Sequence, residues 1–227
     1  HARQADFIIV MAVTDPAKGS RGGMTAFLVD KGTKGLSIPS VFNTMGEHAP
    51  YAVFLDNVEV SDEQVLGEVG NGFGPMQNRL GVRRMEIACR SLGYARRCMD
   101  LMLTQANERK TFGALLAERQ QVQWWLADSW QEMEMVRWIT WRLAWKMDQG
   151  DTNWRREASM VKLQGSEMIA RISDRAIQLL GGMGVSKDMP LEYIARACRV
   201  LRIFEGPSEV HRWVIARDLL RNGMPAD

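Results

Sequence analysis

The chain has 227 residues, of which 46% are hydrophobic and 25% are charged, and its formal net charge is +2. This composition excludes a disordered chain, because such chains combine few apolar residues with a high net charge. The near balance of acidic and basic residues argues against a dedicated nucleic-acid binder. No apolar run approaches the roughly 18 residues that a membrane span requires.

The cysteines are Cys89, Cys98 and Cys198. They are too few and too widely spaced for a disulfide framework, and they form no close pairing with histidine of the kind that binds zinc. We expect them to be buried as small apolar residues rather than to act as reactive thiols. The sequence predicts no metal site.

The first 70 residues show the pattern of short strands. Apolar, β-branched runs bounded by glycine, proline or aspartate occur at 6–13, 24–29, 35–38 and 51–60. This spacing is typical of an antiparallel sandwich or barrel, but about four strands are too few to close one. We therefore predict that residues 1–70 are the C-terminal part of an antiparallel β-domain.

After residue 70 the apolar residues recur at intervals of three and four, which predicts helices. The predicted helices cover residues 85–108, 114–149, 152–180, 190–201 and 208–220. Because each has one apolar face and short loops join them, residues 71–227 are predicted to form an antiparallel bundle. The predicted fold class is α+β, a partial antiparallel β-domain followed by a domain of the four-helix-bundle type.

Seven of the eight tryptophans lie between residues 124 and 154. Trp138, Trp141 and Trp145 fall on one face of a predicted helix. Such a stripe is typical of a bundle interior or a subunit interface, and a cofactor-binding or membrane-facing stripe is the alternative.

Four short segments at element boundaries carry residues that packing alone does not explain. They are GEVGNGF at 67–73, RKTFG at 109–113, QLLGGMG at 178–184 and FEGPSEVHR at 204–212. Each taken singly has an ordinary explanation as a helix cap, a helix stop or a turn. In this order, between a strand-rich unit and a helical bundle, they resemble the acyl-CoA dehydrogenase family, and the resemblance covers essentially the whole chain. MTAFLVD at 24–30 and VLGE at 65–68 are similar to the family's middle β-domain and its exit.

The resemblance implies FAD-dependent α,β-dehydrogenation of an acyl-CoA thioester. A carboxylate base in a water-poor pocket removes the α proton while the β hydride passes to the flavin. Glu205 stands at the family's base position, and its backbone N–H, with a flavin hydroxyl, is expected to polarise the thioester carbonyl. The implied substrate contacts are Arg84, near the CoA chain, and Gly206. For Arg84 the alternative is a solvated helix arginine beside Arg83.

The resemblance also implies the cofactor contacts. Arg109 is expected to bind the FAD pyrophosphate with its forked guanidinium, in a site shared with a neighbouring subunit. The other expected contacts are Thr111, Phe112, Gln120, Gln178, Gly181 and Gly182. The sequence departs from the family pattern at Arg119, Pro207 and Glu209, where the family often has His, Thr and Gln. None of these changes removes the base, so we expect catalysis with altered cofactor contacts.

The family resemblance further implies a homo-oligomer, a dimer or a homotetramer, that oxidises fatty acyl-CoA or related thioesters and passes electrons to electron-transfer flavoprotein or a similar acceptor. A cytoplasmic location is expected, or a mitochondrial or peroxisomal one in a eukaryote. The alternatives are a non-catalytic partner subunit, an acyl-CoA oxidase and a DNA-binding relative, the last disfavoured by the net charge. We expect His1 to lie within the β-domain, and this segment alone to bind FAD weakly.

Overall fold

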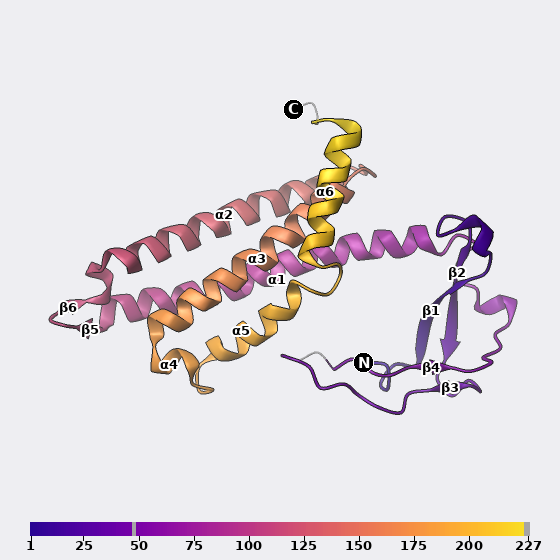
Figure 1. Ribbon diagram of the computed structural model, residues 1–227, viewed down its shortest axis with the longest axis horizontal. Coiled ribbons are helices and arrows are strands. Elements are labelled where there is room, and N and C mark those ends of the chain that lie inside the picture. Colours follow the sequence, from indigo (N-terminus) through magenta and orange to yellow (C-terminus); the bar gives the residue numbers. More distant parts are fainter. Residues whose placement is uncertain (47–48, 225–227) are drawn as a thin grey trace. The chain divides into compact units, whose positions relative to one another are not determined.

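The computed structural model describes residues 1–46 and 49–224. It divides into two compact units, residues 1–80 and residues 81–227, and the division falls within helix α1 (Phe73–Glu108). The boundary predicted between residues 70 and 71 lies just before this helix. The α+β prediction is confirmed, because antiparallel strand pairs and long helices are both present (Figure 1).

The first unit is built on one antiparallel strand pair. Strand β1 (Phe7–Val13) pairs with β2 (Met24–Asp30) along its whole length, with Phe7 opposite Asp30. Strands β3 and β4 form a second pair, of two residues each. The shorter elements of this unit are β3 (Leu36–Ser37), β4 (Phe54–Leu55) and the 3-10 turns η1 (Pro16–Lys18) and η2 (Asp62–Gln64).

The strand predicted at 51–60 is wrong over most of its length. The part that pairs with β3 is Phe54–Leu55. Asn57 has a φ of 47°, a left-handed conformation that asparagine tolerates and a strand does not contain. The chain therefore turns out of the sheet directly after β4.

A buried threonine joins the end of the first unit to its strand pair. The Thr25 side chain is fully buried, and its hydroxyl accepts a hydrogen bond of 2.9 Å from the Gly70 N–H. The same hydroxyl lies 2.8 Å from that of Thr14. The glycine-rich segment at 67–73 thus closes the β unit immediately before α1 begins.

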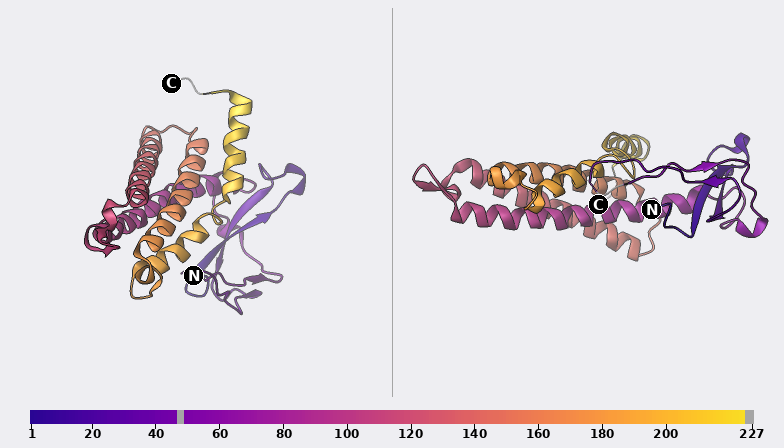
Figure 2. Two further views of the ribbon diagram at one scale, coloured as in Figure 1. Left: turned by 60° about the vertical axis from the view of Figure 1, so that its left-hand side comes forward. Right: turned by 90° about the horizontal axis from the view of Figure 1, so that it is seen from below.

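The second unit is a helical bundle. Its further elements are β5 (Lys110–Thr111), β6 (Ala114–Leu115), η3 (Leu116–Glu118), α2 (Gln120–Asp148), α3 (Arg155–Leu180), α4 (Gly182–Val185), α5 (Pro190–Leu201) and α6 (Ser208–Asn222). Helices α2 and α3 run side by side with the part of α1 that belongs to this unit, while α6 runs across them (Figures 1 and 2).

Three of the predicted helices begin elsewhere than expected, and one of them, α3, starts at Arg155 rather than at residue 152. Helix α1 starts at Phe73 rather than at residue 85, because Pro75 falls in its first turn, where a missing N–H costs nothing. The helix predicted from residue 114 starts at Gln120. Residues 110–115 instead form the β5–β6 hairpin, and η3 follows it.

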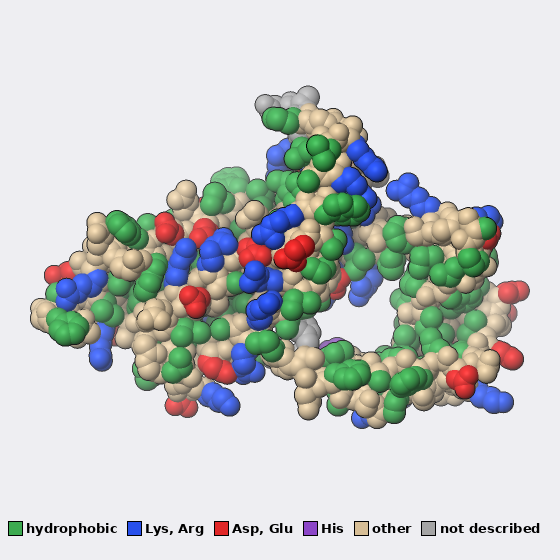
Figure 3. Space-filling model, viewed as in Figure 1, with side chains coloured by type: hydrophobic (Ala, Val, Ile, Leu, Met, Phe, Trp, Pro, Cys, Tyr) green, Lys and Arg blue, Asp and Glu red, His purple; other side chains and the backbone are tan. Residues whose placement is uncertain are grey.

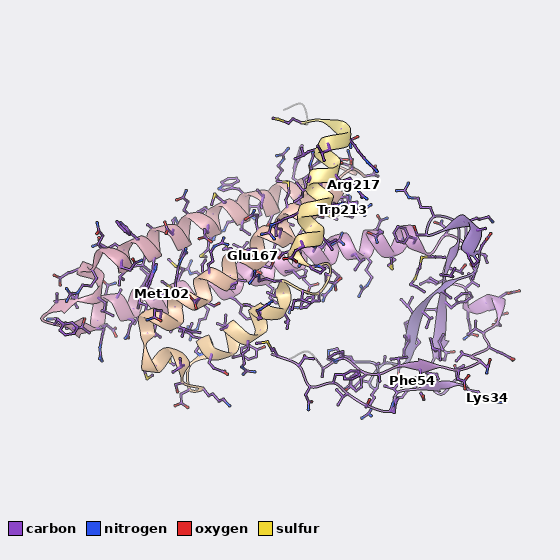
Figure 4. All side chains as sticks on the ribbon, in the orientation of Figure 1. Lys34, Phe54, Met102, Glu167, Trp213 and Arg217 are labelled. Atoms are coloured by element: carbon purple, nitrogen blue, oxygen red, sulfur yellow. The ribbon has the colours of Figure 1, made fainter. Side chains whose placement is uncertain are left out.

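Helix α3 is the centre of the bundle. It packs against α2, α4, α5 and α6, and it also approaches α1 closely. At Gly165 a Cβ atom would lie only 2.9 Å from the Cα of Ala88, so the absence of a side chain permits this approach. Met102 of α1, labelled in Figure 4, is fully buried, and Ile169 of α3 is fully buried in the same apolar core.

The tryptophan stripe lies on the surface of this chain. Trp138, Trp141 and Trp145 are 63%, 55% and 63% exposed, so their predicted place in the bundle interior is wrong. The subunit-interface alternative stays a prediction. In the described part of the chain, no helix combines the length and the apolar character that a membrane crossing needs.

The cysteines differ from one another. Cys98 and Cys198 are buried as expected, and burial raises the pKa of each thiol to about 12. Cys89 is exposed, because it faces outward from α1, so the expectation of burial is wrong there.

Candidate active site

Glu205 lies in the turn at residues 202–207 that joins α5 to α6. Its φ is 56° and that of Gly206 is 105°, so two consecutive residues have positive φ. This conformation is uncommon for a residue with a side chain, and it persists where surrounding contacts impose it. At Gly206 a Cβ would lie 2.9 Å from Nε2 of His211, so both the φ and the space favour glycine.

Basic side chains from three helices contact the carbonyl groups of this turn. The Nε of Arg84, on α1, donates to the carbonyl oxygen of Glu205 at 3.2 Å. The Nε2 of His211, on α6, lies 3.3 Å from the same oxygen. The Nζ of Lys162, on α3, donates to the carbonyl oxygen of Gly206 at 2.5 Å. The backbone of the turn is therefore held by tertiary contacts.

The Glu205 carboxylate faces a cation. Its Oε1 lies 3.7 Å from the Nε of Arg83, and its side chain is 18% exposed. That Nε is buried and has no hydrogen-bond partner, whereas the other end of the guanidinium pairs with Glu86. The carboxylate is thus shielded from most of the solvent while one face stays accessible.

Burial controls the charge of the two groups beneath the turn. Lys162 and His211 are both fully buried. Burial, together with the positive charge of Arg84, lowers the pKa of Lys162 to about 8 and that of His211 to about 4. The imidazole is therefore neutral near pH 7. We assign its proton to Nε2, because the atom that Nε2 faces is a carbonyl acceptor.

A second contact set holds the ends of the turn against α3. Glu167 accepts hydrogen bonds from Oγ of Ser208 at 2.7 Å and from Nε of Arg202 at 3.0 Å (Figure 4). Burial opposes its ionisation, but these two bonds hold the pKa of Glu167 below its usual value. Acidic and basic side chains are intermixed over α3, α5 and α6 on this face (Figure 3).

A separate cavity of about 530 Å³ lies at the far end of the bundle. It brings together Arg109, Thr111, Gly181 and Gly182, with leucine side chains on its walls. Neither glycine has an atom within 4 Å of where a Cβ would stand. A guanidinium, a hydroxyl and open glycine backbone beside apolar walls suit a ligand that joins an anionic group to a flat apolar body. These residues fit FAD.

The remaining predicted cofactor residues do not line this cavity. Phe112 is at the tip of the β5–β6 hairpin with a φ of 50°, and its side chain is fully exposed. Arg119 holds the hairpin by donating from Nη2 to the Thr111 carbonyl at 2.7 Å. Gln120 and Gln178 are exposed, at the start of α2 and near the end of α3. Their side chains face solvent in this chain.

Sequence reasoning missed Lys162, and it assigned nothing to His211. A lysine flanked by Val161 and Leu163 in an otherwise apolar helix face is a weak signal of burial, and nothing in the local sequence shows what its amine contacts. His211 lies in the FEGPSEVHR segment, but its proximity to Gly206 follows from the start of α6.

Known proteins are similar to this chain in sequence and in fold. The family model for the acyl-CoA dehydrogenase C-terminal domain matches residues 70–220. Over 217 residues the chain is 50% identical to (R)-benzylsuccinyl-CoA dehydrogenase of Thauera aromatica, covering 96% of this chain and 53% of that protein. It is 37% identical over 221 residues to the mitochondrial short-chain specific acyl-CoA dehydrogenase of Mus musculus, again covering 96% and 53%.

A solved structure shares the fold as well. The butyryl-CoA dehydrogenase of Megasphaera elsdenii superposes with a TM-score of 0.88 at 31% identity, covering 96% of this chain and 57% of that one. The chain spans about half the length of the curated relatives it matches.

Proposed function

Because the chain belongs to the acyl-CoA dehydrogenase family, we propose that it forms the base-carrying part of a flavoenzyme that dehydrogenates acyl-CoA thioesters. The observation that carries this proposal is the Glu205 turn. A partly buried carboxylate projects from a backbone whose carbonyl groups are held by contacts from three helices. Such a fixed carboxylate suits the removal of a weakly acidic proton.

In the proposed reaction Glu205 takes the proton from the α carbon of the thioester. The pair of electrons in that C–H bond becomes the α,β double bond as hydride leaves the β carbon. FAD, when bound, supplies the hydride acceptor. The Glu205 N–H polarises the thioester carbonyl, which lowers the cost of the negative charge that develops there. Arg84 and Gly206 border the substrate.

The FAD contacts fall into two groups. Arg109, Thr111, Gly181 and Gly182 border one cavity, where the guanidinium binds the pyrophosphate. The exposed residues Phe112, Gln120 and Gln178 contact the same cofactor, which lies in a site shared with a neighbouring copy. A homo-oligomer, a dimer or tetramer, follows from this shared site.

The substrate is a fatty acyl-CoA or a related thioester. The 50% identical relative is named for (R)-benzylsuccinyl-CoA, which adds branched, aryl-bearing thioesters to the candidates. Electrons pass to electron-transfer flavoprotein or a similar acceptor, in the cytoplasm or, in a eukaryote, in mitochondria or peroxisomes.

Glu205→Gln tests the base assignment. Because weak binding of FAD is expected, the protein is assayed in excess FAD with butyryl-CoA and benzylsuccinyl-CoA by reduction of an electron-acceptor dye, and a titration followed by flavin absorbance reports bound FAD. We expect the variant to bind FAD as the parent does and to lose roughly 100- to 10,000-fold in turnover, because an amide cannot act as the general base. Unchanged turnover would overturn the base assignment, and an absence of turnover in the parent with FAD bound would indicate a non-catalytic partner subunit. Peroxide formation without dye would identify an oxidase.

A further inference from the structure

The turn that carries Glu205 does not hold its shape by itself. Positive φ values at Glu205 and Gly206 are unfavourable for the first of these residues and direct both carbonyl oxygens toward the helices. A relaxed turn would move the carboxylate, because the side chain follows its own Cα. Something outside the turn must therefore supply the stabilising contacts.

Lys162 is an unusual means of supplying them. Its side chain is fully buried in α3, where an ammonium group loses its hydration. Its Nζ donates to a neutral carbonyl, that of Gly206, rather than to a carboxylate. An apolar residue of similar length would fill the same space without that loss. The amine is thus explained by what it does to the turn.

His211 contributes from the opposite element. Its ring is fully buried at the start of α6, and Nε2 faces both the Glu205 carbonyl and the position that a Cβ would take on Gly206. The ring therefore fills the space that a side chain at residue 206 would need, and it offers a donor to the preceding carbonyl. The hydrogen bond to the Glu205 carbonyl favours the left-handed turn, and the packing of the ring excludes any residue but glycine at position 206.

We propose that Lys162 and His211 are positioning residues that keep the Glu205 carboxylate aimed at the substrate by binding the carbonyl groups of its turn. This inference rests on the proposed function, since it assigns Glu205 as the base. Neither residue touches the α carbon. Removing either donor lets the turn relax, which slows proton removal but leaves the binding of substrate and flavin in place.

The experiment compares Lys162→Met and His211→Leu, which remove the donors, with His211→Gln, which keeps one. Lys146→Met is the matched control, because Lys146 is only 16% exposed and its Nζ pairs with the Glu157 carboxylate rather than with a carbonyl of the turn. Flavin bleaching by acyl-CoA gives the reduction rate and the substrate affinity in one titration. Substrate deuterated at the α carbon gives the isotope effect on proton removal.

We expect Lys162→Met and His211→Leu to slow bleaching at least 10-fold, with substrate affinity within about twofold and a larger isotope effect. His211→Gln should recover most of the rate, and Lys146→Met should match the parent. Without substrate, hydrogen exchange in the segment 202–211 should accelerate in the two donor-removing variants but not in Lys146→Met.

If Lys162→Met has the bleaching rate and the hydrogen exchange of the parent, the assignment of Lys162 is overturned. A loss confined to substrate affinity, flavin content or melting temperature would also overturn it. If Lys162→Met does not fold, the test rests on the two His211 variants. Equal bleaching rates in His211→Leu and His211→Gln would then overturn the inference. Glu205→Gln distinguishes a failure of the base assignment from a failure of the positioning inference. If that variant keeps its turnover, the base assignment fails. If it loses turnover while Lys162→Met bleaches normally, only the positioning inference fails.

Discussion

The Nε of Arg84 donates a 3.2 Å hydrogen bond to the carbonyl oxygen of Glu205, a residue 121 positions later in the chain. This bond joins the turn between α5 and α6 to α1. Burial, and then the charge of Arg155, lower the pKa of Arg84, but the group stays cationic, because arginine does not lose its proton in proteins. The bond is therefore charge-assisted.

Arg84→Gln should reduce turnover by roughly 10- to 100-fold, since a hydrogen bond from a charged donor contributes about 1.5–3 kcal/mol. Steady-state kinetics with an acceptor dye measure the effect. Arg96→Gln is the control on the same helix, because Arg96 is exposed and pairs with Asp100 one turn away. Equal turnover in the two variants would contradict a contribution of Arg84 to the site.

The acid sensitivity of the fold should depend on His211. Its pKa is lowered to about 4 by burial and the charges of Arg84 and Lys162, from an ordinary value near 6.5. Between those pH values the unfolded chain binds a proton at this imidazole that the folded protein does not. The contribution of His211 to the unfolding free energy is therefore fully present above pH 6.5, and it is lost as the pH falls toward 4.

His211→Gln removes this titration and keeps a side-chain donor. Between pH 6.5 and 4 the parent should lose about 2–3 kcal/mol more unfolding free energy than the variant. Urea unfolding at each pH measures both curves, and carboxylates that titrate in the same range cancel in the difference. Parallel curves would show that the imidazole takes up its proton without unfolding.

Replacing glycine by alanine should change the stability in opposite directions at two positions of the bundle. Gly165→Ala places a Cβ 2.9 Å from the Cα of Ala88, and a backbone atom yields less readily than a side chain. We expect a loss of about 1–3 kcal/mol in unfolding free energy. Gly93→Ala on α1 meets nothing within 4 Å and should stabilise the helix by up to about 1 kcal/mol. Thermal unfolding of both variants checks the signs, and two changes of one sign would refute the packing explanation.

The sequence predicted those helices whose boundaries are set by neighbouring residues, such as a proline in the first turn and regularly spaced apolar residues. The helix predicted at 190–201 agrees with Pro190–Leu201, because Pro190 favours the first turn and Leu191, Ile194 and Cys198 form one buried face. The start of α1 was missed, because Gly74 and Pro75 interrupt the apolar pattern that marks a helix.

The candidate site was predicted less completely than the fold. The family motif pointed to Glu205 and Arg109, but the contacts beneath the Glu205 turn join residues far apart in the chain. Lys162 lies 44 positions from Gly206, and its burial is set by the packing of α3 rather than by its neighbours in sequence. Tertiary contacts of this kind leave no periodic signal.

The cavity beside the β5–β6 hairpin leads to a prediction about the flavin. Arg109→Gln removes the one guanidinium among the residues that line it in the described chain, so FAD phosphates lose a charged, forked donor. We expect FAD to dissociate at least about 10-fold more readily, equivalent to roughly 1.4 kcal/mol. Flavin absorbance after dialysis measures retention. Arg97→Gln, on the exposed face of α1, should retain flavin like the parent, and equal loss in both variants would exclude a specific contact.

The exposed tryptophans of α2 lead to a prediction about assembly. Trp138 and Trp141 contact each other edge to face at 5.1 Å, and both are more than half exposed, as is Trp145. Large aromatic groups clustered on one surface are typical of protein interfaces. Trp138→Glu puts a charge within this stripe, where burial against a second copy would strip its hydration. We expect sedimentation to show a shift from oligomer to smaller species, with unchanged helical content by circular dichroism. Arg96→Glu introduces the same charged residue on α1, where the Arg96 side chain is 66% exposed and pairs with Asp100, and should leave the oligomer intact. An unchanged oligomer in Trp138→Glu would place the subunit contact on another face of the bundle.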